Sequence, residues 1–303
     1  MTFVHMLNST PAPLSLPSVG NSAMLVELSF SCWTGRKKDK KARAQIAQHY
    51  HANERAVNAT KVLLGDCPEL EAVQKYKATV QTGFHYSMTL PWSDSGLRIL
   101  PTTRFMDYQN GITERQARFN DLVEQFLDRY EWYAAEAQAQ LGDLFARDEY
   151  PTPETLRTKF SMRVNYLPLP DAGDFRVDVG EQATDMLKQH YEQHYSNMLE
   201  RASLDAWRRT HDSVSRLVKS LTVEADGKRG RIYESTFESV QGLIDGLRDF
   251  NLTGDASMEA ARQRLESALN GVGLDALKES DSKREEVKEN LQAVLDSLPS
   301  LDI

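Results

Sequence analysis

The sequence predicts an α+β protein that is predominantly helical, with a small antiparallel sheet and long antiparallel helices. Two stretches of about 30 to 40 residues repeat apolar side chains every three or four positions, as amphipathic helices do. Three shorter stretches alternate apolar and polar side chains, as half-buried strands do, and turn residues divide two of them into hairpins. These patterns favour a sheet of two hairpins plus an N-terminal strand, which carries the long helices.

The strands are expected in three places. An N-terminal strand over 24–33 has one strongly apolar face and is ended by Gly35. A first hairpin is expected within 83–101, because Ser93-Asp94-Ser95-Gly96 has the composition of a turn. A second hairpin is expected over 162–179, where alternation resumes after a Pro- and Gly-containing turn.

The helices of the first half follow from spacing and capping residues. A loose helical pattern covers 38–64, and a short helix is expected after Pro68. The apolar stripe from Glu114 to Phe145 predicts a helix close to 50 Å long, with Thr113 and Gln116 as its capping box. Thr152, Pro153 and Glu154 predict a brief helix to about Lys159.

The second half is expected to be helical throughout. Gly180 opens a stripe of about 35 to 40 residues that ends at the break GKRGR, residues 227–231. Its aromatic and small residues favour a packed helical hairpin over a long coiled coil. Two or three shorter helices follow, separated at 251–254 and 271–273.

The composition shifts suggest three segments along the chain. Residues 1–23 are a Pro- and Ser-containing arm, 24–180 the sheet-containing α+β domain, and 181–303 a helical domain with acidic C-terminal helices. The last 53 residues carry eleven acids and six bases. They form either a solvated outer face or a docking element for a basic protein, including the basic corner of another copy of this chain.

The composition also indicates the cellular compartment that we expect for this chain. The net charge is −8, and no run of about 18 uncharged apolar residues exists, so we expect no membrane span. The first two dozen residues lack the basic start and apolar run of a secretory signal. Cys32 and Cys67 allow at most one disulfide. A cytoplasmic protein with reduced thiols is expected.

The most conspicuous local feature is a run of six cations in eight residues: Arg36, Lys37, Lys38, Lys40, Lys41 and Arg43. In an acidic protein such a run favours an anionic partner, with nucleic-acid phosphate as the first candidate. The alternatives are a solvated corner between a strand and a helix, or a site for an acidic protein. A smaller cluster of Lys228, Arg229 and Arg231 either cooperates with the first or is a loop.

Two aromatic residues lie near the first cluster. Trp33 precedes it by three residues, and Tyr50 follows it by one to two helical turns. Exposed rings beside cations favour stacking on the bases of a single strand. A tryptophan on a short strand is more often half-buried in the core, which is the alternative for Trp33.

The remaining motifs do not support catalysis or a cofactor. His190 and His194 are four apart, a spacing that suits two metal ligands, but no third ligand is apparent, and a polar helix edge is the better interpretation. No phosphate-binding Gly-rich loop occurs. The segment from Asp107 to Gly111 fails as a calcium loop because Arg118 occupies the twelfth position. We therefore expect no cofactor, no metal and no enzymatic activity.

Two stretches resemble a known family. They are LVELSFSCWTGRKKDKKA near the start and FLDRYEWYAAEAQAQLGDLFARDEYPTPETLRTKFSMRVNYLPLPDAGDFRVDV in the middle. Together they resemble a family of phage and plasmid proteins known as domain-of-unknown-function family 3150, over roughly residues 25–179. The matching positions in the first stretch include Trp33, Gly35, Arg36 and Lys37, although the usual WxGRKKL opening is here WTGRKKDKK.

The resemblance implies a set of partner proteins but no enzymatic activity. Genes of the family often lie beside MoxR-type AAA+ ATPases and CobT-like von Willebrand A proteins, which implies an adaptor role with such an ATPase in a bacterial host cell. We therefore expect a non-enzymatic phage or mobile-element protein that acts as scaffold, adaptor or self-assembling subunit, as a homo-oligomer or with a protein partner. The alternative is a nucleic-acid-binding protein that uses the cluster from Arg36 to Arg43.

Overall fold

The structure is a computed structural model that describes residues 17–169, 181–222 and 229–300. In it the chain forms two compact units. The first, here the bundle unit, comprises the residues up to Glu27, Met88–Met106 and the residues from Tyr166 on. The second, here the α3–α5 unit, comprises Leu28–Ser87 and Asp107–Asn165 and is named for its helices α3 (Pro68–Ala78) and α5 (Phe105–Leu141). The chain therefore passes from one unit to the other four times.

This division differs from the linear one expected at 23/24 and 180/181, and the boundaries of independently folding domains stay a prediction. Residues 1–16 of the expected arm lie outside the described part. The end of the arm forms the short helix α1 (Pro17–Ser22), in which Val19 is buried.

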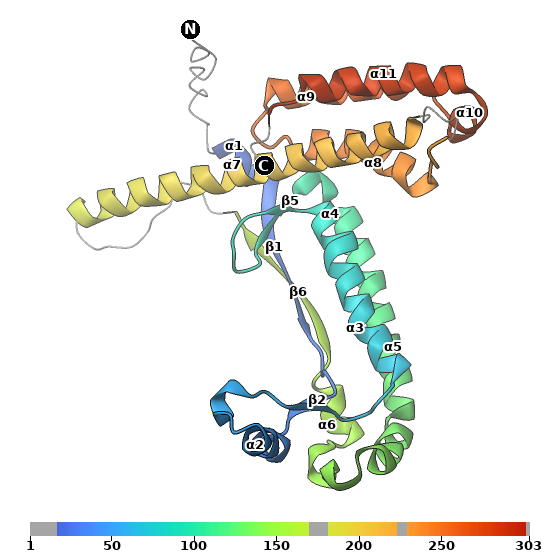
Figure 1. The fold of residues 1–303 in the computed structure, drawn as a ribbon. Helices are drawn as coiled ribbons and strands as arrows, with labels where there is room; N and C mark the ends of the chain where they lie inside the picture. The colour runs from blue at the N-terminus through green and yellow to red at the C-terminus, as the bar shows by residue number, and fades with distance from the viewer. Residues whose placement is uncertain (1–16, 170–180, 223–228, 301–303) are drawn as a thin grey trace. The chain divides into compact units, whose positions relative to one another are not determined.

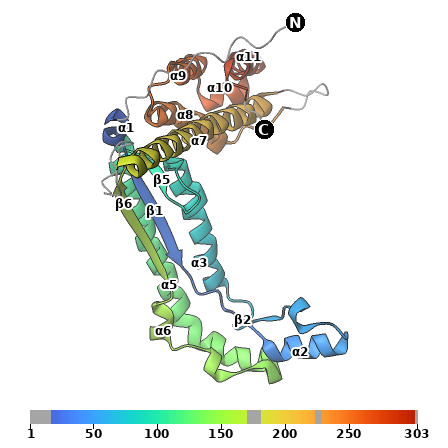
Figure 2. The same ribbon diagram turned by 90° about the vertical axis from the view of Figure 1, so that its left-hand side faces the viewer.

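The expected α+β class is confirmed. A four-stranded antiparallel sheet has the order β4-β5-β1-β6, and a separate two-stranded sheet pairs β2 with β3. The strands of the larger sheet are β1 (Ala23–Ser31), β4 (Leu90–Pro91), β5 (Arg98–Pro101) and β6 (Ser161–Pro168). All other long elements are helices (Figures 1 and 2).

The first hairpin is confirmed at β4 and β5, but it is shorter than expected. Residues 83–88 belong to a π-helix (Thr79–His85) and to α4 (Tyr86–Met88), which continue α3. Packing overrides the β propensity of these aromatic residues, because the Phe84 ring stacks on Tyr108 of α5 with centroids 5.4 Å apart. Strand β6 lies where the first strand of the second hairpin is expected, and the expected return strand at 175–179 lies outside the described residues.

The expected helix over 38–64 is wrong beyond His49. Helix α2 (Lys40–His49) ends where His51 adopts the left-handed conformation, with φ of 51°. The N–H of Ala52 then bonds the carbonyl of Ala47 at 2.8 Å, as in a helix C-terminal turn. A 3₁₀ turn and strand β3 (Thr60–Val62) follow.

Helix α5 is confirmed as a long helix, but it begins nine residues before the expected start. Thr113 is not a cap, because its hydroxyl donates to the carbonyl of Gln109 within the helix, at 2.8 Å. The 37 residues of α5 make it about 55 Å long. Helix α6 (Pro153–Arg157) is confirmed, with Thr152 as its cap.

Helices α3 and α5 lie side by side and antiparallel in the α3–α5 unit (Figures 1 and 2). Glu69 at the start of α3 bonds Tyr133 and Arg129, at 2.5 Å each, whereas Phe84 beyond its end meets Tyr108. On β1, Phe30 packs edge-on against Phe119 of α5 with centroids 5.6 Å apart. The core of the unit is therefore built along α5.

The bundle unit contains helix α7 (Glu181–Leu221), which begins where expected and runs for 41 residues. Four helices follow rather than two or three: α8 (Glu234–Phe250), α9 (Ala256–Leu269), α10 (Leu274–Glu279) and α11 (Asp281–Ser297). The additional helix arises because Ser280 caps α11 and separates it from α10. The buried stripe of α7 packs against α8 and α11, and α9 packs against both. Among the described helices, none combines the length and apolarity that a membrane span requires.

Candidate functional site

The six-cation cluster lies in a small closed element of the α3–α5 unit, residues 35–63, which we call the basic module. Strand β2 (Arg36–Lys38) leads into α2, and the chain returns to pair β3 with β2. The N–H of Leu63 bonds the carbonyl of Gly35 at 2.7 Å, which closes the module. In Figures 1 and 2, β2 and α2 lie at the same end of the unit as α6.

One face of the two-stranded sheet is electrically neutral. Lys37 is opposite Lys61 in the register, so their side chains share a face. The Lys61 ammonium lies 2.5 Å from Glu149 and 3.6 Å from Asp39, and Lys37 lies 3.6 Å from Glu149. Two cations and two carboxylates therefore balance there.

The other face of β2 carries unpaired positive charge. Arg36 and Lys38 are two residues apart on one strand and therefore point away from Lys37, next to Thr60 and Val62 of β3. Both side chains are exposed, and neither has an acidic partner among the residues that the structure describes. This face is available to an external anion.

The start of α2 adds two further cations. Lys40 and Lys41 lie in its first turn and are exposed, again without an acidic partner within the described ranges. Asp39 caps the helix by accepting from the N–H of Ala42 at 2.9 Å. This hydrogen bond and the charge of Lys61 hold the pKa of Asp39 below its usual value. Because Asp39 occupies the N-terminus of α2, the groups left there for an external anion are side chains rather than the capped backbone N–H.

Only Arg43 of the six expected cations is paired within the module. Its guanidinium lies 3.1 Å from the carboxylate of Glu54. Four cations thus remain unpaired in the described structure: Arg36, Lys38, Lys40 and Lys41.

The two aromatic residues near the cluster differ in role. Trp33 is half-buried, with its ring 6.1 Å from that of Phe126 and 6.0 Å from that of Tyr130, so it belongs to the core. Tyr50 is 72% exposed. Only Tyr50 is therefore available to stack on a ligand.

The second expected cluster lies in the other unit, and its two described members, Arg229 and Arg231, have partners. Arg229 donates to Asp281 at 2.7 Å and to the carbonyl of Lys278 at 3.2 Å. The guanidinium of Arg231 lies 4.9 Å above the Tyr233 ring. Lys228 lies outside the described residues. The two clusters thus belong to different units.

The sequence did not reveal the two charged residues that neutralise one face of the basic module together with Lys37 and Asp39. Lys61 and Glu149 are 88 positions apart, and no local pattern connects them; only the pairing of β3 with β2 places Lys61 beside Lys37. Arg55 is a further exposed cation in the 3₁₀ turn after α2. A search for cations beyond the first run would have found Arg55.

Other groups with possible chemistry do not converge. His190 and His194 are both exposed on α7, and among the described residues no three His, Cys, Asp or Glu side chains are placed to hold a metal ion. Burial raises the pKa of the Cys32 and Cys67 thiols, so neither is an activated nucleophile.

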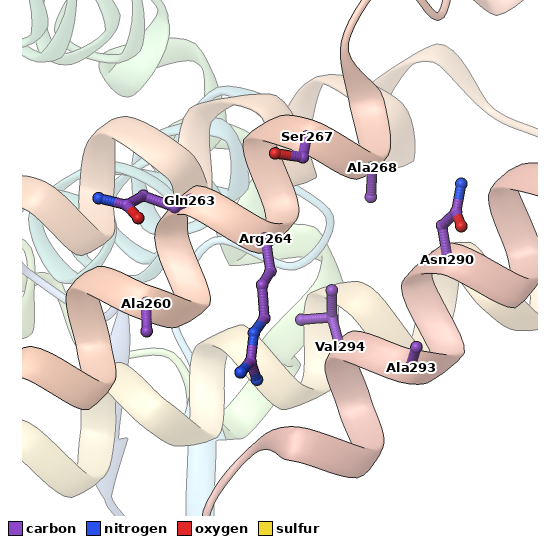
Figure 3. Close-up of a pocket in the computed structure, with 8 residues that line it drawn as sticks. All are labelled: Ala260, Gln263, Arg264, Ser267, Ala268, Asn290, Ala293 and Val294. Carbon is purple, nitrogen blue, oxygen red and sulfur yellow. The ribbon is translucent and has the colours of Figure 1, made fainter.

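A groove of about 660 Å³ lies between α9 and α11 in the bundle unit (Figure 3). It is lined by small and polar side chains: Ala260, Gln263, Arg264, Ser267, Ala268, Asn290, Ala293 and Val294. Arg264 is the one charged residue among them, so the lining offers no acid and base pair and no base that would activate the Ser267 hydroxyl.

No protein-family model, curated protein or solved structure matches the chain. The resemblance to domain-of-unknown-function family 3150 therefore stays a prediction, as do the phage origin and the ATPase partner.

Proposed function

We propose that this chain acts by binding nucleic acid, and that the basic module holds the phosphate backbone. The observation that supports this function best is the set of four exposed, unpaired cations on β2 and at the start of α2 in a protein of net charge −8. Each phosphate that such a cation neutralises releases a counterion, which favours binding and makes it depend on salt.

The positions of the four cations are electrostatically unfavourable in the free protein, which agrees with a binding role. Lys40 and Lys41 lie at the positive end of the α2 dipole, where each cation is unfavourable by about 0.3 to 1 kcal/mol. Arg36 and Lys38 share one face of a strand at a spacing of about 7 Å, where like charges repel. A bound polyanion removes both costs.

The test is an anisotropy titration of a fluorescein-labelled oligonucleotide at several salt concentrations. We expect the variant R36Q/K38Q/K40Q/K41Q to bind more weakly and to lower the magnitude of the salt slope by about 3, because four phosphate contacts are lost. A matched control is K75Q/R118Q/K159Q/R163Q, which removes the same charge from exposed positions of the same unit.

The control variant should keep most of the slope of the natural sequence. Equal slopes in the two variants would show that net charge alone drives binding. An unchanged slope in the first variant would exclude the basic module as the phosphate site.

A second candidate function is protein binding, as scaffold, adaptor or self-assembling subunit. It is favoured by Trp132, whose side chain is 55% exposed on α5, with the Arg129 guanidinium 5.5 Å from its ring. Tryptophan, tyrosine and arginine are the residues that most often dominate the energy of protein interfaces. Arg129 also lies 5.4 Å from the ring of Tyr133, so all three types meet here.

Size-exclusion chromatography with light scattering tests this second function, with the chain alone and with a purified MoxR-type AAA+ ATPase. Trp132→Ala should weaken an association that uses this surface by about 2 kcal/mol or more, whereas Tyr50→Ala should leave it unchanged. A monomer that binds no partner at high concentration would count against it.

A further inference from the structure

The side chain of Tyr50 is the most exposed large hydrophobic group in the described part of the chain. Single exposed apolar residues are common on protein surfaces and need no explanation. Three of the eleven exposed large hydrophobic residues, however, lie in the basic module: Ile46, Tyr50 and Val62. The positive charge and the exposed apolar surface of this module thus occur together.

The conformation at the end of α2 presents the ring without burying it. The N–H of Tyr50 still bonds the carbonyl of Ile46 at 3.0 Å, so the residue continues the helix by one position. His51 then turns the chain away through its left-handed conformation. The ring of His49 meets the Tyr50 ring edge-on, with centroids 4.8 Å apart. This contact supports the ring while most of its surface stays exposed.

Exposure of this degree shows that the ring contributes little to folding. A side chain that is 72% exposed fills no core cavity, so its removal leaves no void. The exposed ring therefore suits a ligand better than it suits the fold.

Two of the four cations, Lys40 and Lys41, lie in the first turn of α2, and the ring of Tyr50 lies at the other end of this helix. From Lys40 to Tyr50 the rise is about 15 Å. Sites that bind single strands combine a positively charged groove with aromatic side chains and cover roughly 4 to 16 nucleotides per domain. The same strand can therefore contact the cations with its phosphates and the ring with a base.

A duplex cannot use the ring in this way. Its bases are stacked on one another, and exposing one to an external ring requires unstacking. The four cations, in contrast, attract the phosphates of single strands and duplexes alike. The ring is thus the feature that distinguishes the two forms of nucleic acid.

We propose that the basic module binds single-stranded nucleic acid in preference to duplex, with Tyr50 as a stacking platform for a base. This inference rests on the proposed nucleic-acid binding and names the form of ligand that the same site accepts.

The experiment compares three fluorescein-labelled probes: a 20-nucleotide oligothymidylate, an oligouridylate of the same length, and a 20-base-pair duplex of mixed sequence. The protein is the full chain and the variants are Tyr50→Ala, Tyr50→Phe and, as a control for an exposed ring elsewhere in the unit, Trp132→Ala. Circular dichroism confirms that each variant is folded.

We expect the natural sequence to bind at least one of the two single strands more tightly than the duplex. Tyr50→Ala should weaken single-strand binding roughly 5- to 150-fold, the range for loss of one base-stacking contact. Duplex affinity and the salt slope should not change, because stacking releases no counterion. Tyr50→Phe, which keeps the ring, should bind like the natural sequence, and so should Trp132→Ala.

The proposed nucleic-acid binding and the single-strand preference would be contradicted by different results. If no probe binds, or if binding does not depend on the four cations, the proposed function itself is wrong. If the duplex binds as tightly as both single strands, or if Tyr50→Ala binds like the natural sequence, nucleic-acid binding stands and the single-strand inference is overturned.

Discussion

The two basic clusters of the chain are similar in sequence and differ in structure. Both are short runs of Lys and Arg next to a glycine. In the α3–α5 unit, Arg36 and Lys38 have no acidic partner among the described residues, whereas in the bundle unit Arg229 is bonded to Asp281 and to a carbonyl. The comparison shows that a run of cations keeps unpaired charge only where the fold supplies fewer acids than bases.

The glycine of the bundle cluster also has a structural role, and so has Arg284, an arginine outside the cluster that binds this segment. A Cβ at Gly230 would lie 2.5 Å from the carbonyl oxygen of Ser220, so only glycine lets the chain pass α7 this closely. Arg284 of α11, 4% exposed, donates to the carbonyl of Gly230 at 2.9 Å and to that of Leu277 at 2.6 Å. The guanidinium groups in this region hold the bundle together.

The largest effect on stability is therefore expected from Arg284→Met. The change keeps the buried aliphatic volume but removes two charge-assisted hydrogen bonds, and should lower the free energy of unfolding by about 2 to 3 kcal/mol. Arg36→Gln in the basic module should change it by less than about 0.5 kcal/mol. Urea unfolding followed by circular dichroism measures both, and equal losses would contradict the contrast between the clusters.

The contrast can be sharpened by converting paired cations into unpaired ones. Glu149→Gln removes the carboxylate that Lys37 and Lys61 share, so the basic module gains positive charge. We expect tighter binding of an oligonucleotide and a salt slope steeper by about 1. Glu131→Gln, at an exposed acid of α5 in the same unit, is the control for net charge and should have a smaller effect.

A pH dependence is expected from the cap of α2. Because the pKa of Asp39 is lower in the folded chain than its ordinary value of 3.8, its ionised form stabilises the fold above that pH. This contribution is lost as the pH falls through the folded-state value. The difference in melting temperature between the natural sequence and Asp39→Ala should thus be constant from pH 7 to 5 and shrink below pH 4. A difference that grows on acidification would contradict the assignment.

The smallest effect is expected from Asp281→Asn. It frees Arg229 of its acidic partner, but the guanidinium still donates to the carbonyl of Lys278. An exposed ion pair contributes at most about 1 kcal/mol, so stability should fall only slightly. Oligonucleotide binding should not change, and a gain equal to that of Glu149→Gln would show that the bundle cluster also binds nucleic acid.

The features predicted correctly from sequence are those with local causes. The stripe of α5, the turn at 93–96 and the cap at Thr152 each depend on residues a few positions apart. Strands β2 and β3, of three residues each, are too short to show an alternation, and the helix over 79–88 depends on packing of Phe84 against α5. The sequence patterns therefore predict neither this pair of strands nor this helix.

The candidate site shows the same limit. The cations of residues 36–43 are evident in the sequence, but which of them are neutralised depends on Glu149, more than 100 residues away. The exposure of Tyr50 depends on the turn at His51, where a non-glycine residue adopts the left-handed conformation. Neither can be inferred from the run of cations itself.

The four crossings between the units have a consequence for biosynthesis. All segments of the α3–α5 unit have been translated once residue 165 has left the ribosome, whereas the bundle unit must wait for α11. One early segment, β4, therefore remains without α7, the helix that packs against it, while more than 100 further residues are added. If the gene were divided after codon 180, the early segments of the bundle unit would be on a different fragment from α7 to α11. The two fragments should therefore recover their structure only when they are expressed together.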